Sequence, residues 1–485
     1  MHDAAPWPRQ GQAGVSVYSH CIHTLFIHCE YTKVFMQVLP HVQLVDGSGG
    51  EDDELRILQL TDMHLFPHGC TGWICSPKGA FDSRHVDFRK EGHPSPMTSD
   101  DAVVMVSTLI RRVRPHLVAF TGDIVDGRPF GAEYPAVPPT RTPNGLAFDL
   151  FAEAFMRVLA PLHGIPWIFC PGNHDDDGSP WSRNDLLRIF ALDGCATPTA
   201  TCFDHTFTVG FGDEADKSSV RIWNFDSGAN RRDIKYEPVS ATSVSRYEAL
   251  SAQLPNVAAE LAFVHVPLPE YASAKIVAGT CGLFPARVRA GMLVRPWKWL
   301  PQALYMRLGP WLGHDRAVGC SRVNTGLCAA LARQGRVCAL SCGHNHFNDF
   351  VGLHDESLFL CFGRVSGLSP PITWERDGGA LPFHPGGRVF GVRTEMHGLH
   401  PQDSSRKGKV ATWVMTAAEE AAQERITLDP QLYARSKNNG SNHVNGEICT
   451  TGTGSRLRIA RRPMIATTLA VLGLGVLRVI YLARA

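Results

Sequence analysis

The segment HLVAFTGDIVD, residues 116–126, is the stretch that most clearly indicates the fold. Its first five residues are mostly apolar, as in a buried strand, and Gly122 then allows a tight turn before Asp123. A run with helical spacing of apolar residues, 103–113, lies just before it and is closed by Pro115. A helix followed by a strand that delivers a carboxylate is the rhythm of βαβ units, so this region predicts an α/β domain.

Four other polar motifs lie in similar settings, most of them directly after an apolar run that indicates a buried strand. Those runs are residues 55–60, 166–170, 261–264 and 337–340, and residues 148–162 have the pattern of a second amphipathic helix. The motifs are Asp62-Met63-His64, Gly172-Asn173-His174-Asp175, His265 within Phe263-Val264-His265-Val266-Pro267, and Gly343-His344-Asn345-His346. Ligand-binding residues of such sheets gather at the carboxyl ends of the strands, so we expect the five motifs to meet.

The side chains in these motifs are carboxylates, imidazoles and an amide, which are types that hold metal ions. One metal is predicted to be held by Asp62, His64, Asp123 and His346, and a second by Asp123, Asn173, His265 and His344. Asp123 is then the carboxylate that bridges both. Alternate residues of an extended segment point the same way, which makes Asp62 and His64 a sensible pair of ligands. Nitrogen and oxygen ligands without thiolates favour Mn, Fe or Zn.

Such a centre is suited to the hydrolysis of phosphoesters. Two cations about 3.5–4 Å apart clamp phosphoryl oxygens and acidify a water between them. His174 is not needed as a ligand, so we predict that it protonates the leaving oxygen or stabilises developing charge. Asp126, three residues after Asp123, is the predicted partner that orients His174. His174 and Asp126 are therefore the predicted catalytic pair, acting beside a hydroxide that bridges two metals.

Each motif alone is weak evidence. The chain has 22 histidines, so an Asp-X-His or His-X-His pair arises readily by chance. His265 taken alone would be interpreted as a core histidine, and Asp62 with His64 as a structural pair. The order and setting of all five motifs favour the metal site over these structural alternatives.

The set Asp62-X-His64, GDIVD, GNHD, His265 and GHNH resembles the calcineurin-like metallophosphoesterase superfamily. Within it, the chain is most similar to purple-acid-phosphatase-like proteins of plants and fungi that carry an Asp-Met-His first motif. Segments 265–270, 321–326 and 344–350 share that likeness, which covers about residues 54–395 apart from inserts. The resemblance implies a four-layer α/β/β/α sandwich with a dinuclear metal site at strand ends. It also implies the ligand and catalytic roles given above.

The chain departs from true purple acid phosphatases at two of these positions. Those enzymes have a tyrosine ligand where this chain has Asp126, and they lack a histidine at the position of His64. We therefore expect no tyrosinate-to-iron colour, and an acid optimum is not assumed.

The leading functional prediction is a metal-dependent phosphomonoesterase, with phosphoproteins and small phosphoesters as candidate substrates. A phosphodiesterase acting on nucleotides or phospholipid headgroups is the alternative, because the same two-metal core serves both reactions. A membrane-anchored binding protein with a decayed site is disfavoured, since no predicted ligand is missing. The net charge of +1 provides no global field for nucleic acid, which is not an expected partner.

The sequence divides into four predicted parts. These are an N-terminal extension (1–50), a catalytic domain (51–400) with a basic, Trp-rich insert (284–317), a polar, partly disordered linker (401–463), and an apolar C-terminal segment (464–483). The insert would lie on a membrane surface or cap the substrate; the alternative is a solvated excursion. Strand-like runs at 358–362 and 389–393 carry no ligand types and are predicted to complete a second sheet.

The segment 464–483 is long enough to cross a bilayer if Arg478 reaches an interface. The alternative is an apolar terminal helix that packs on the domain. Four arginines precede the segment and would hold the catalytic domain in the cytosol, whereas the sequon Asn439-Gly440-Ser441 has meaning only in a lumenal orientation. We expect membrane association through this tail with a cytosolic domain, and keep the lumenal orientation as the alternative.

The fourteen cysteines are too dilute for a disulfide scaffold. Cys70 with Cys75, and Cys195 with Cys202, lie in loop-like stretches and are candidates for bridges. Cysteines in strand-like runs, such as Cys170, are predicted to be buried thiols.

Overall fold

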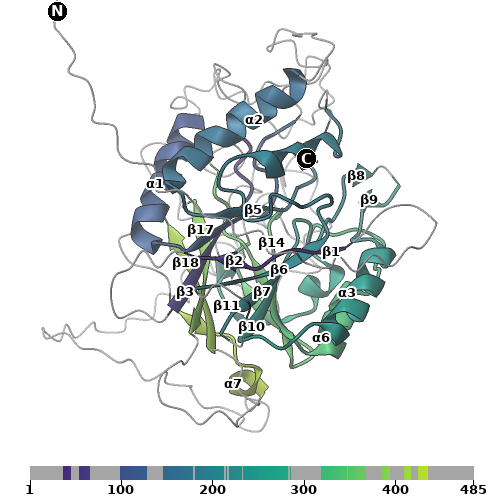
Figure 1. Ribbon diagram of the computed structural model, residues 1–485. Coiled ribbons are helices and arrows are strands. Elements are labelled where there is room, and N and C mark those ends of the chain that lie inside the picture. The colour runs from purple at the N-terminus through teal and green to yellow at the C-terminus, as the bar shows by residue number, and fades with distance from the viewer. Residues whose placement is uncertain are drawn as a thin grey trace, which may run out of the picture. The chain divides into compact units, whose positions relative to one another are not determined.

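The computed structural model describes residues 36–44, 54–65, 99–127, 146–177, 181–211, 215, 218–231, 233–281, 284–285, 318–346, 348–367, 385–393, 409–416 and 424–434 (Figure 1). All of these belong to one compact unit, Met1–Ser436. Most of the insert 284–317, the tail 464–483, and Cys70 with Cys75 lie outside the described residues.

A six-stranded sheet carries the first three polar motifs. Its strand order is β19-β18-β17-β3-β4-β5. The strands are β3 (Glu54–Leu60), β4 (Leu117–Phe120), β5 (Trp167–Phe169), β17 (Gly386–Arg393), β18 (Lys409–Thr416) and β19 (Ile426–Thr427). The first three are parallel, and β17 runs antiparallel to β3. The carboxyl ends of β3, β4 and β5 therefore meet at one edge.

A nine-stranded sheet carries the last two motifs. Its order is β1-β6-β7-β10-β14-β16-β15-β11, and β2 pairs with β6. The strands are β1 (Gln37–Val38), β2 (Val42–Gln43), β6 (His205–Gly210), β7 (Val220–Asn224), β10 (Ala259–Phe263), β11 (Lys275–Ala278), β14 (Val337–Cys342), β15 (Val351–His354) and β16 (Leu358–Phe362). Strands β7, β10, β14 and β16 are parallel, so β10 and β14 also end side by side.

Helices cover the outer face of each sheet, which completes four layers (Figure 1). Helices α1 (Ser99–Val113) and α2 (Leu146–Leu159, followed by the 3₁₀ turn Ala160–Leu162) bury apolar residues in the same core as β3 and β4. Helices α3 (Ala241–Gln253) and α6 (Leu327–Gln334) do so against β7, β10 and β14. The α/β/β/α sandwich predicted from the sequence is confirmed.

The remaining described elements are short. They are the hairpins β8 (Asn230–Arg231) with β9 (Lys235–Tyr236) and β12 (Thr280–Cys281) with β13 (Phe284–Pro285), the 3₁₀ helices Asp185–Ala191 and Pro269–Ala272, and α7 (Pro430–Ala434). Within the described ranges, no helix has the length and apolar character needed to cross a membrane.

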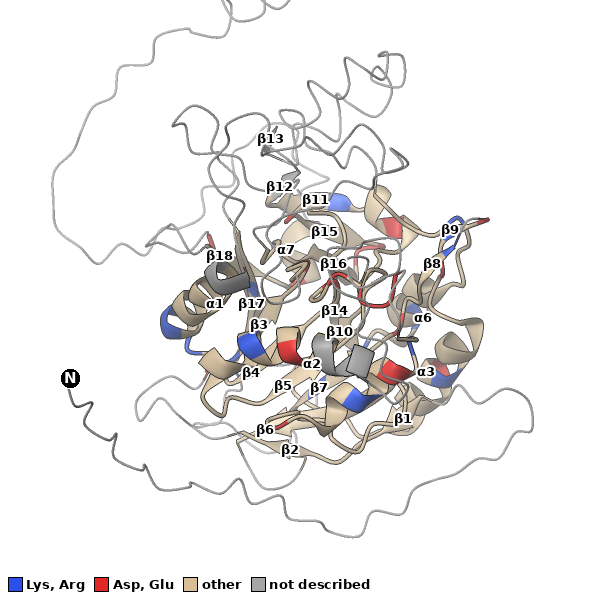
Figure 2. Ribbon diagram, turned by 90° about the horizontal axis from the view of Figure 1, so that it is seen from above, with Lys and Arg blue, Asp and Glu red and all other residues tan. Residues whose placement is uncertain are grey.

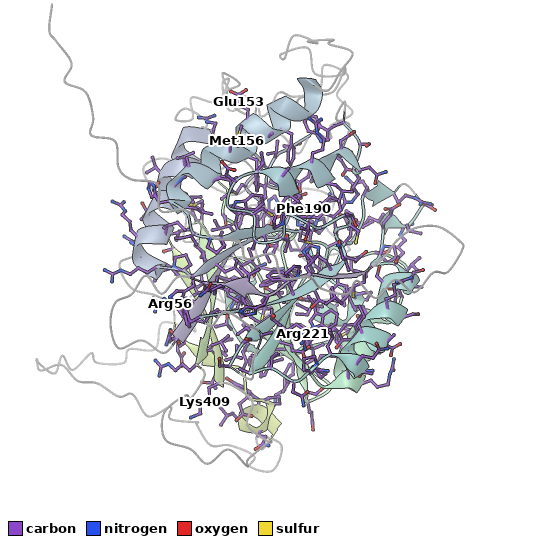
Figure 3. The ribbon with its side chains drawn as sticks, viewed as in Figure 1. Arg56, Glu153, Met156, Phe190, Arg221 and Lys409 are labelled. Atoms are coloured by element: carbon purple, nitrogen blue, oxygen red, sulfur yellow. The ribbon has the colours of Figure 1, made fainter. Side chains whose placement is uncertain are left out.

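Helix α2 shows how sequence spacing selects the buried face. Phe151, Phe155 and Val158 are buried at helical spacing. Glu153 and Met156 fall between them and are exposed on the outer side (Figure 3). Each buried large apolar side chain contributes about 1.5–3 kcal/mol to folding. The helix is therefore held by its aromatic face.

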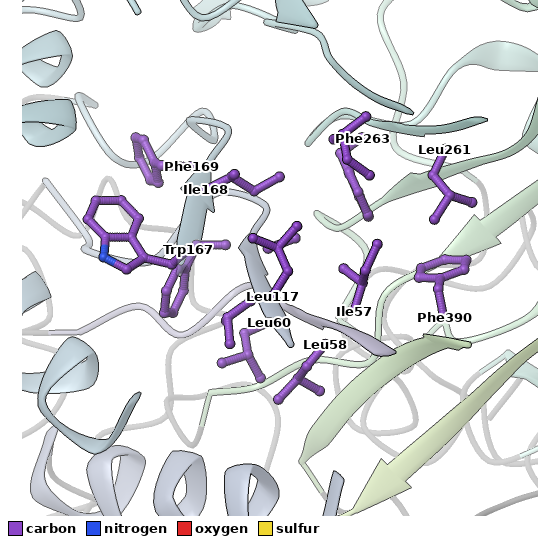
Figure 4. Close-up of a cluster of buried hydrophobic side chains, with 14 of the residues drawn as sticks. Ile57, Leu58, Leu60, Leu117, Trp167, Ile168, Phe169, Leu261, Phe263 and Phe390 are labelled. Carbon is purple, nitrogen blue, oxygen red and sulfur yellow. The ribbon is translucent and has the colours of Figure 1, made fainter. Parts of the chain in front are cut away.

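The space between the two sheets is filled from both sides. Ile57 and Leu58 of β3 lie in the same buried cluster as Leu261 of β10 (Figure 4). Phe263 of β10 meets Phe390 of β17 edge to face, with ring centroids 5.9 Å apart. This contact fixes the two sheets to each other behind the strand ends that carry the polar motifs.

One polar residue also crosses between the sheets. Gln59 of β3 is fully buried, and its Nε2 donates to Thr121 Oγ1 (2.8 Å) and to the carbonyl of Cys342 (3.2 Å). The Ser341 hydroxyl donates to Gln59 Oε1 at 2.6 Å. All three partners lie one or two residues from a predicted motif, so this network sets the spacing of the two sheets at the site.

The structure places strands in two segments that the sequence assigned to an extension and a linker. Strand β18 lies inside the predicted linker 401–463 and pairs with β17 along its whole length. Strands β1 and β2 fall in the predicted extension 1–50, and each has two residues, too few to show periodicity. Residues 358–362 form β16 beside β14, while 389–393 belong to β17 in the other sheet.

Cys195 and Cys202, the candidates for a bridge among the described residues, are free thiols.

Candidate metal centre

The five motifs meet where the carboxyl ends of β3, β4, β5, β10 and β14 converge. Backbone hydrogen bonds join the first two motifs, from Asp62 N to the Gly122 carbonyl (3.0 Å) and from His64 N to the Asp123 carbonyl (2.9 Å). His344 N donates to both carboxylate oxygens of Asp62, at 3.0 Å. The last contact connects the two sheets. Predicted ligands 282 positions apart in the sequence are thus direct neighbours.

Asp62, His64 and His346 form one group whose ligand atoms all lie within 4.8 Å of one another. The Nε2 atoms of His64 and His346 are 3.1 Å apart, and His346 Nε2 is 3.5 Å from Asp62 Oδ1. Asp123 Oδ2 lies 3.7 Å from His64 Nε2. These are the four residues predicted to hold the first metal.

Asp123, His265 and His344 form the second group, again with ligand atoms within 4.8 Å. His265 Nε2 lies 3.1 Å from Asp123 Oδ2 and 3.2 Å from Asn173 Oδ1. The structure therefore brings together the four residues predicted for the second metal. Because Asp123 approaches histidines of both groups, it stands where a bridging carboxylate would.

Two histidines have their second ring nitrogen bonded outside the centre. His265 Nδ1 faces the Thr121 carbonyl at 2.8 Å, and a carbonyl can only accept. His64 Nδ1 faces Asp126 Oδ2 at 3.3 Å. In both, Nδ1 is the donor and Nε2 is directed at the centre. This is how metal-binding histidines are usually held.

The donor set fits metal ions in a further respect. His344 Nδ1 is buried without a hydrogen-bond partner, although a buried polar nitrogen is normally bonded. Burial, with the charge of His265, holds the pKa of His344 well below its usual value, which keeps the ring neutral. Burial raises the pKa of Asp123, but His265 and His174 outweigh it and hold that pKa well below the usual range. His344 is thus a neutral imidazole and Asp123 an ionised carboxylate, the forms that bind metals. Burial lowers the pKa of His265, but Asp123 outweighs burial and raises that pKa to about 9.

Four of the predicted ligands have left-handed backbone angles, with φ of 56° at Asp62, 47° at His64, 53° at Asp123 and 71° at His344. Each such residue costs about 1–3 kcal/mol, a strain that folded proteins retain mainly at functional sites. Gly172 is required for the same close packing, because a Cβ there would lie 2.2 Å from Asp123 Oδ1.

Residues 55–286 match the family model described as Calcineurin-like phosphoesterase. Over these residues the chain is similar to that family. It is 22% identical over 351 residues to the "Probable inactive purple acid phosphatase 29" of Arabidopsis thaliana, covering 67% of this chain and 75% of that one. "Probable inactive purple acid phosphatase 28" of the same plant is 23% identical, with 70% and 76% covered. "Phosphatase DCR2" of Saccharomyces cerevisiae (strain ATCC 204508 / S288c) is 22% identical, with 64% and 48% covered.

The resemblance inferred from the motifs is therefore confirmed, and the protein is a hydrolase of phosphoric ester bonds. The family match ends before His344 and His346. The structure shows where these two residues lie: β14 pairs with β10 and brings both histidines to the site.

The predicted pairing of His174 with Asp126 is not what the structure shows. His174 Nδ1 lies 2.9 Å from Asp177 Oδ2. Asp126 Oδ2 instead faces His64. The physical reason is the path of the loop after β5, which brings Asp177, three residues beyond His174, against the His174 ring. The sequence does contain a signal for this contact, because Asp177 lies three residues after His174. The chemical role of His174 stays a prediction.

Asp175 is the important residue that sequence reasoning left without a role. It is fully buried, and its carboxylate accepts four backbone N–H groups. The donors are Asp123 N (2.9 Å), Gly172 N (2.7 Å), Ile124 N (3.0 Å) and Val125 N (3.0 Å). Burial and the nearby Asp123 raise the pKa of Asp175 to about 7, against the pull of these donors. Asp175 therefore ties the GDIVD and GNHD motifs into one unit.

Replacing Asp175 with Asn should break this unit. An amide has one acceptor oxygen, so its NH₂ group would face two of the four N–H donors. Each buried donor left unpaired costs about 1–3 kcal/mol, so we expect a loss of about 2–6 kcal/mol in the free energy of unfolding, measured by urea denaturation. Exposed Asp193, replaced by Asn, is the control. An equal, small effect of both changes would show that Asp175 does not hold the motifs together.

The charge pattern around the site is uneven. In the view of Figure 2, acidic residues gather in the central loops near β14 and β16, whereas Lys and Arg are spread over the surrounding elements. Metal ions held by the predicted ligands would lie among these carboxylates. The loaded centre, rather than the protein surface as a whole, would then attract an anionic substrate.

Proposed function

We propose that this protein is a phosphomonoesterase that holds two metal ions, of the Mn, Fe or Zn type, between seven side chains. The observation that carries the proposal is the completeness of the site. All seven predicted ligands lie at one edge of the sandwich, in two groups that share the neighbourhood of Asp123. The unpartnered nitrogen of His344 adds an independent sign that a group is to be bound there.

Bound metals would neutralise phosphoryl charge and acidify a water molecule. The protein's own contribution lies in placing the ligands and a proton donor. Hydrolysis breaks the bond between phosphorus and the leaving oxygen, joins the oxygen of water to phosphorus, and leaves a proton on the leaving oxygen. His174 is suited to supply that proton, since its side chain is 22% exposed and its ring lies 5.5 Å from that of His64.

A cation at the rim supports a dianionic monoester as the substrate. The Lys235 ammonium lies 4.9 Å from the centroid of the Tyr236 ring, whose own centroid is 4.4 Å from that of His344. Lys235 is exposed and has no acidic partner among the described residues. An unpaired positive charge beside the second ligand group suits the extra negative charge of a monoester. The second candidate function is a phosphodiesterase that acts on nucleotides or phospholipid headgroups.

The proposals for the substrate and for the location of the protein are based on the sequence alone. Phosphoproteins and small phosphoesters are the proposed substrates, and nucleic acid is not a proposed partner. The tail 464–483 is proposed to associate with a membrane, with the catalytic domain in the cytosol. The two Arabidopsis relatives are named inactive and the yeast relative a phosphatase; the proposal of activity here depends on this chain's own ligand set.

The test compares p-nitrophenyl phosphate with bis-p-nitrophenyl phosphate, using the full chain loaded with Mn²⁺. We expect a kcat/KM at least about tenfold higher for the monoester, equivalent to about 1.4 kcal/mol. A preference for the diester would overturn the monoesterase proposal in favour of the second candidate. Failure to hydrolyse either compound with metal bound would contradict both.

A further inference from the structure

Asn230, in the short strand β8, lies outside every motif that the sequence indicates, yet it contacts two residues of the site. Its Oδ1 accepts from Asn173 Nδ2 at 3.2 Å. Its Nδ2 donates to Asp177 Oδ2 at 3.0 Å and to the Asn173 carbonyl at 3.4 Å. One amide thus reaches both a predicted metal ligand and the carboxylate that faces His174.

The first contact fixes the orientation of the Asn173 amide. An amide can point either its oxygen or its NH₂ group toward a metal, and only the oxygen binds one. Because Asn173 Nδ2 donates to Asn230, Asn173 Oδ1 is turned toward His265 Nε2 and the second ligand group. Asn230 therefore holds Asn173 in the orientation that a metal needs.

The second contact acts on His174. Asp177 Oδ2 receives His174 Nδ1 at 2.9 Å and Asn230 Nδ2 at 3.0 Å. The Asp177 side chain is 32% exposed, so without a second partner it would be free to turn toward water. The bond from Asn230 keeps the carboxylate on the ring and keeps the Nδ1 proton in place. His174 Nε2 is then the nitrogen left to face the substrate.

We propose that Asn230 is a positioning residue that couples the two halves of the site, holding Asn173 for the metal and, through Asp177, His174 for proton transfer. The coupling rests on the phosphomonoesterase proposed above. Asn230 is itself exposed, so its substitution leaves the core intact and a structural collapse is not expected. We call the contact with Asn173 the Asn173 arm and the contact with Asp177 the His174 arm. The two arms can be tested separately, because the first uses the amide oxygen of Asn230 and the second its amide nitrogen.

Three substitutions separate the arms. Asn230→Asp keeps an oxygen for Asn173 but places a carboxylate against Asp177, so only the His174 arm is lost. Asp177→Asn weakens the same arm from the other side. Asn230→Ala removes both arms. Exposed Asn256, which makes no side-chain hydrogen bond among the described residues, provides the matched control Asn256→Asp with the same change of charge.

Two readouts are measured on the full chain. One is the Mn²⁺ dissociation constant by calorimetry. The other is kcat on phenyl phosphate and on p-nitrophenyl phosphate, whose leaving groups differ in their need for a proton. Loss of an orienting partner changes metal affinity or activity by about 10–100-fold. For Asn230→Asp and Asp177→Asn we expect such a fall in kcat on phenyl phosphate, a smaller fall on p-nitrophenyl phosphate, and unchanged Mn²⁺ affinity. Asn230→Ala should also weaken Mn²⁺ binding about tenfold.

The double variant Asn230→Asp with Asp177→Asn provides a further check. His174 and Asn230 both contact Asp177 Oδ2, so an amide NH₂ in that place would donate to the new carboxylate and could not accept from His174. We therefore expect kcat on phenyl phosphate to stay as low as in the single variants. Equal falls on both substrates, or variants that behave as Asn256→Asp does, would overturn the coupling. If the wild-type protein prefers the diester, the monoesterase proposal fails by itself. The same variants are then compared on phenyl and p-nitrophenyl diesters, where the same order is expected.

Discussion

Asp123→Asn should leave the centre without metal and reduce turnover at least about 100-fold, because even residues that only orient a ligand are worth about 10–100-fold. Asp123 Oδ2 lies 3.1 Å from His265 and 3.7 Å from His64, between the two ligand groups. Its other oxygen accepts from His174 N at 2.7 Å. An uncharged amide at this position cannot bridge two cations, and its NH₂ group would face a donor. Metal content by mass spectrometry and hydrolysis of p-nitrophenyl phosphate are the measurements.

The control for this experiment is Asp193→Asn, which makes the same chemical change at an exposed position. The control should keep its metal and its rate. An Asp123→Asn protein with full metal content and an unchanged rate would show that Asp123 is not a ligand. Loss of metal with a retained rate would show that the centre does not perform the hydrolysis.

His174→Ala should lower turnover about as much as Asp123→Asn does, but it should leave the metal content unchanged. Removal of a general acid typically lowers a rate by about 10²–10⁴-fold. The ring of His174 bonds to Asp177, whereas its contact with Asp123 is made by the backbone N–H, which alanine retains. We therefore expect a metal-loaded protein with a kcat reduced by that factor on phenyl phosphate.

A histidine of the helix-terminal turn, His163, provides the control. It is exposed and left-handed, with φ of 49°, so Asn is the suitable substitution because Asn tolerates that backbone. His163→Asn should behave as the wild type does. Loss of metal in His174→Ala would assign His174 to the ligand set instead, and an unchanged rate would remove it from the reaction.

The sequence predicted those parts of the fold that have a strong local pattern. The helix expected at 103–113 is α1, Ser99–Val113, and the helix at 148–162 is α2 with its terminal 3₁₀ turn. Strands that run directly into a polar motif were found because an apolar run and its breaking glycine lie next to each other. That glycine precedes Asp123, Asn173 and the two histidines of the last motif, whereas Asp62, His64 and His265 were predicted from the apolar run and the residue types alone.

Elements without local periodicity escaped prediction. Strand β8 has two residues, both exposed, so nothing in its sequence distinguishes it from a loop. Asn230 therefore went unnoticed, although it contacts Asn173 across 57 positions in the sequence. The four N–H groups on Asp175 are a property of two loops folded together, and no spacing in either loop shows it. His64 with Asp126 is likewise a contact across 62 positions.

The division of the ligands between two sheets has a consequence for the order of events in folding. Each ligand group includes a histidine from the segment after β14, His346 in the first and His344 in the second. The contact of Asp62 with His344 spans 282 residues of chain. Contacts of such long sequence separation form late and slowly. Neither group of ligands is therefore complete on a nascent chain until the segment after β14 has emerged from the ribosome. Capture of the proposed metals would then come at the end of the maturation of this protein.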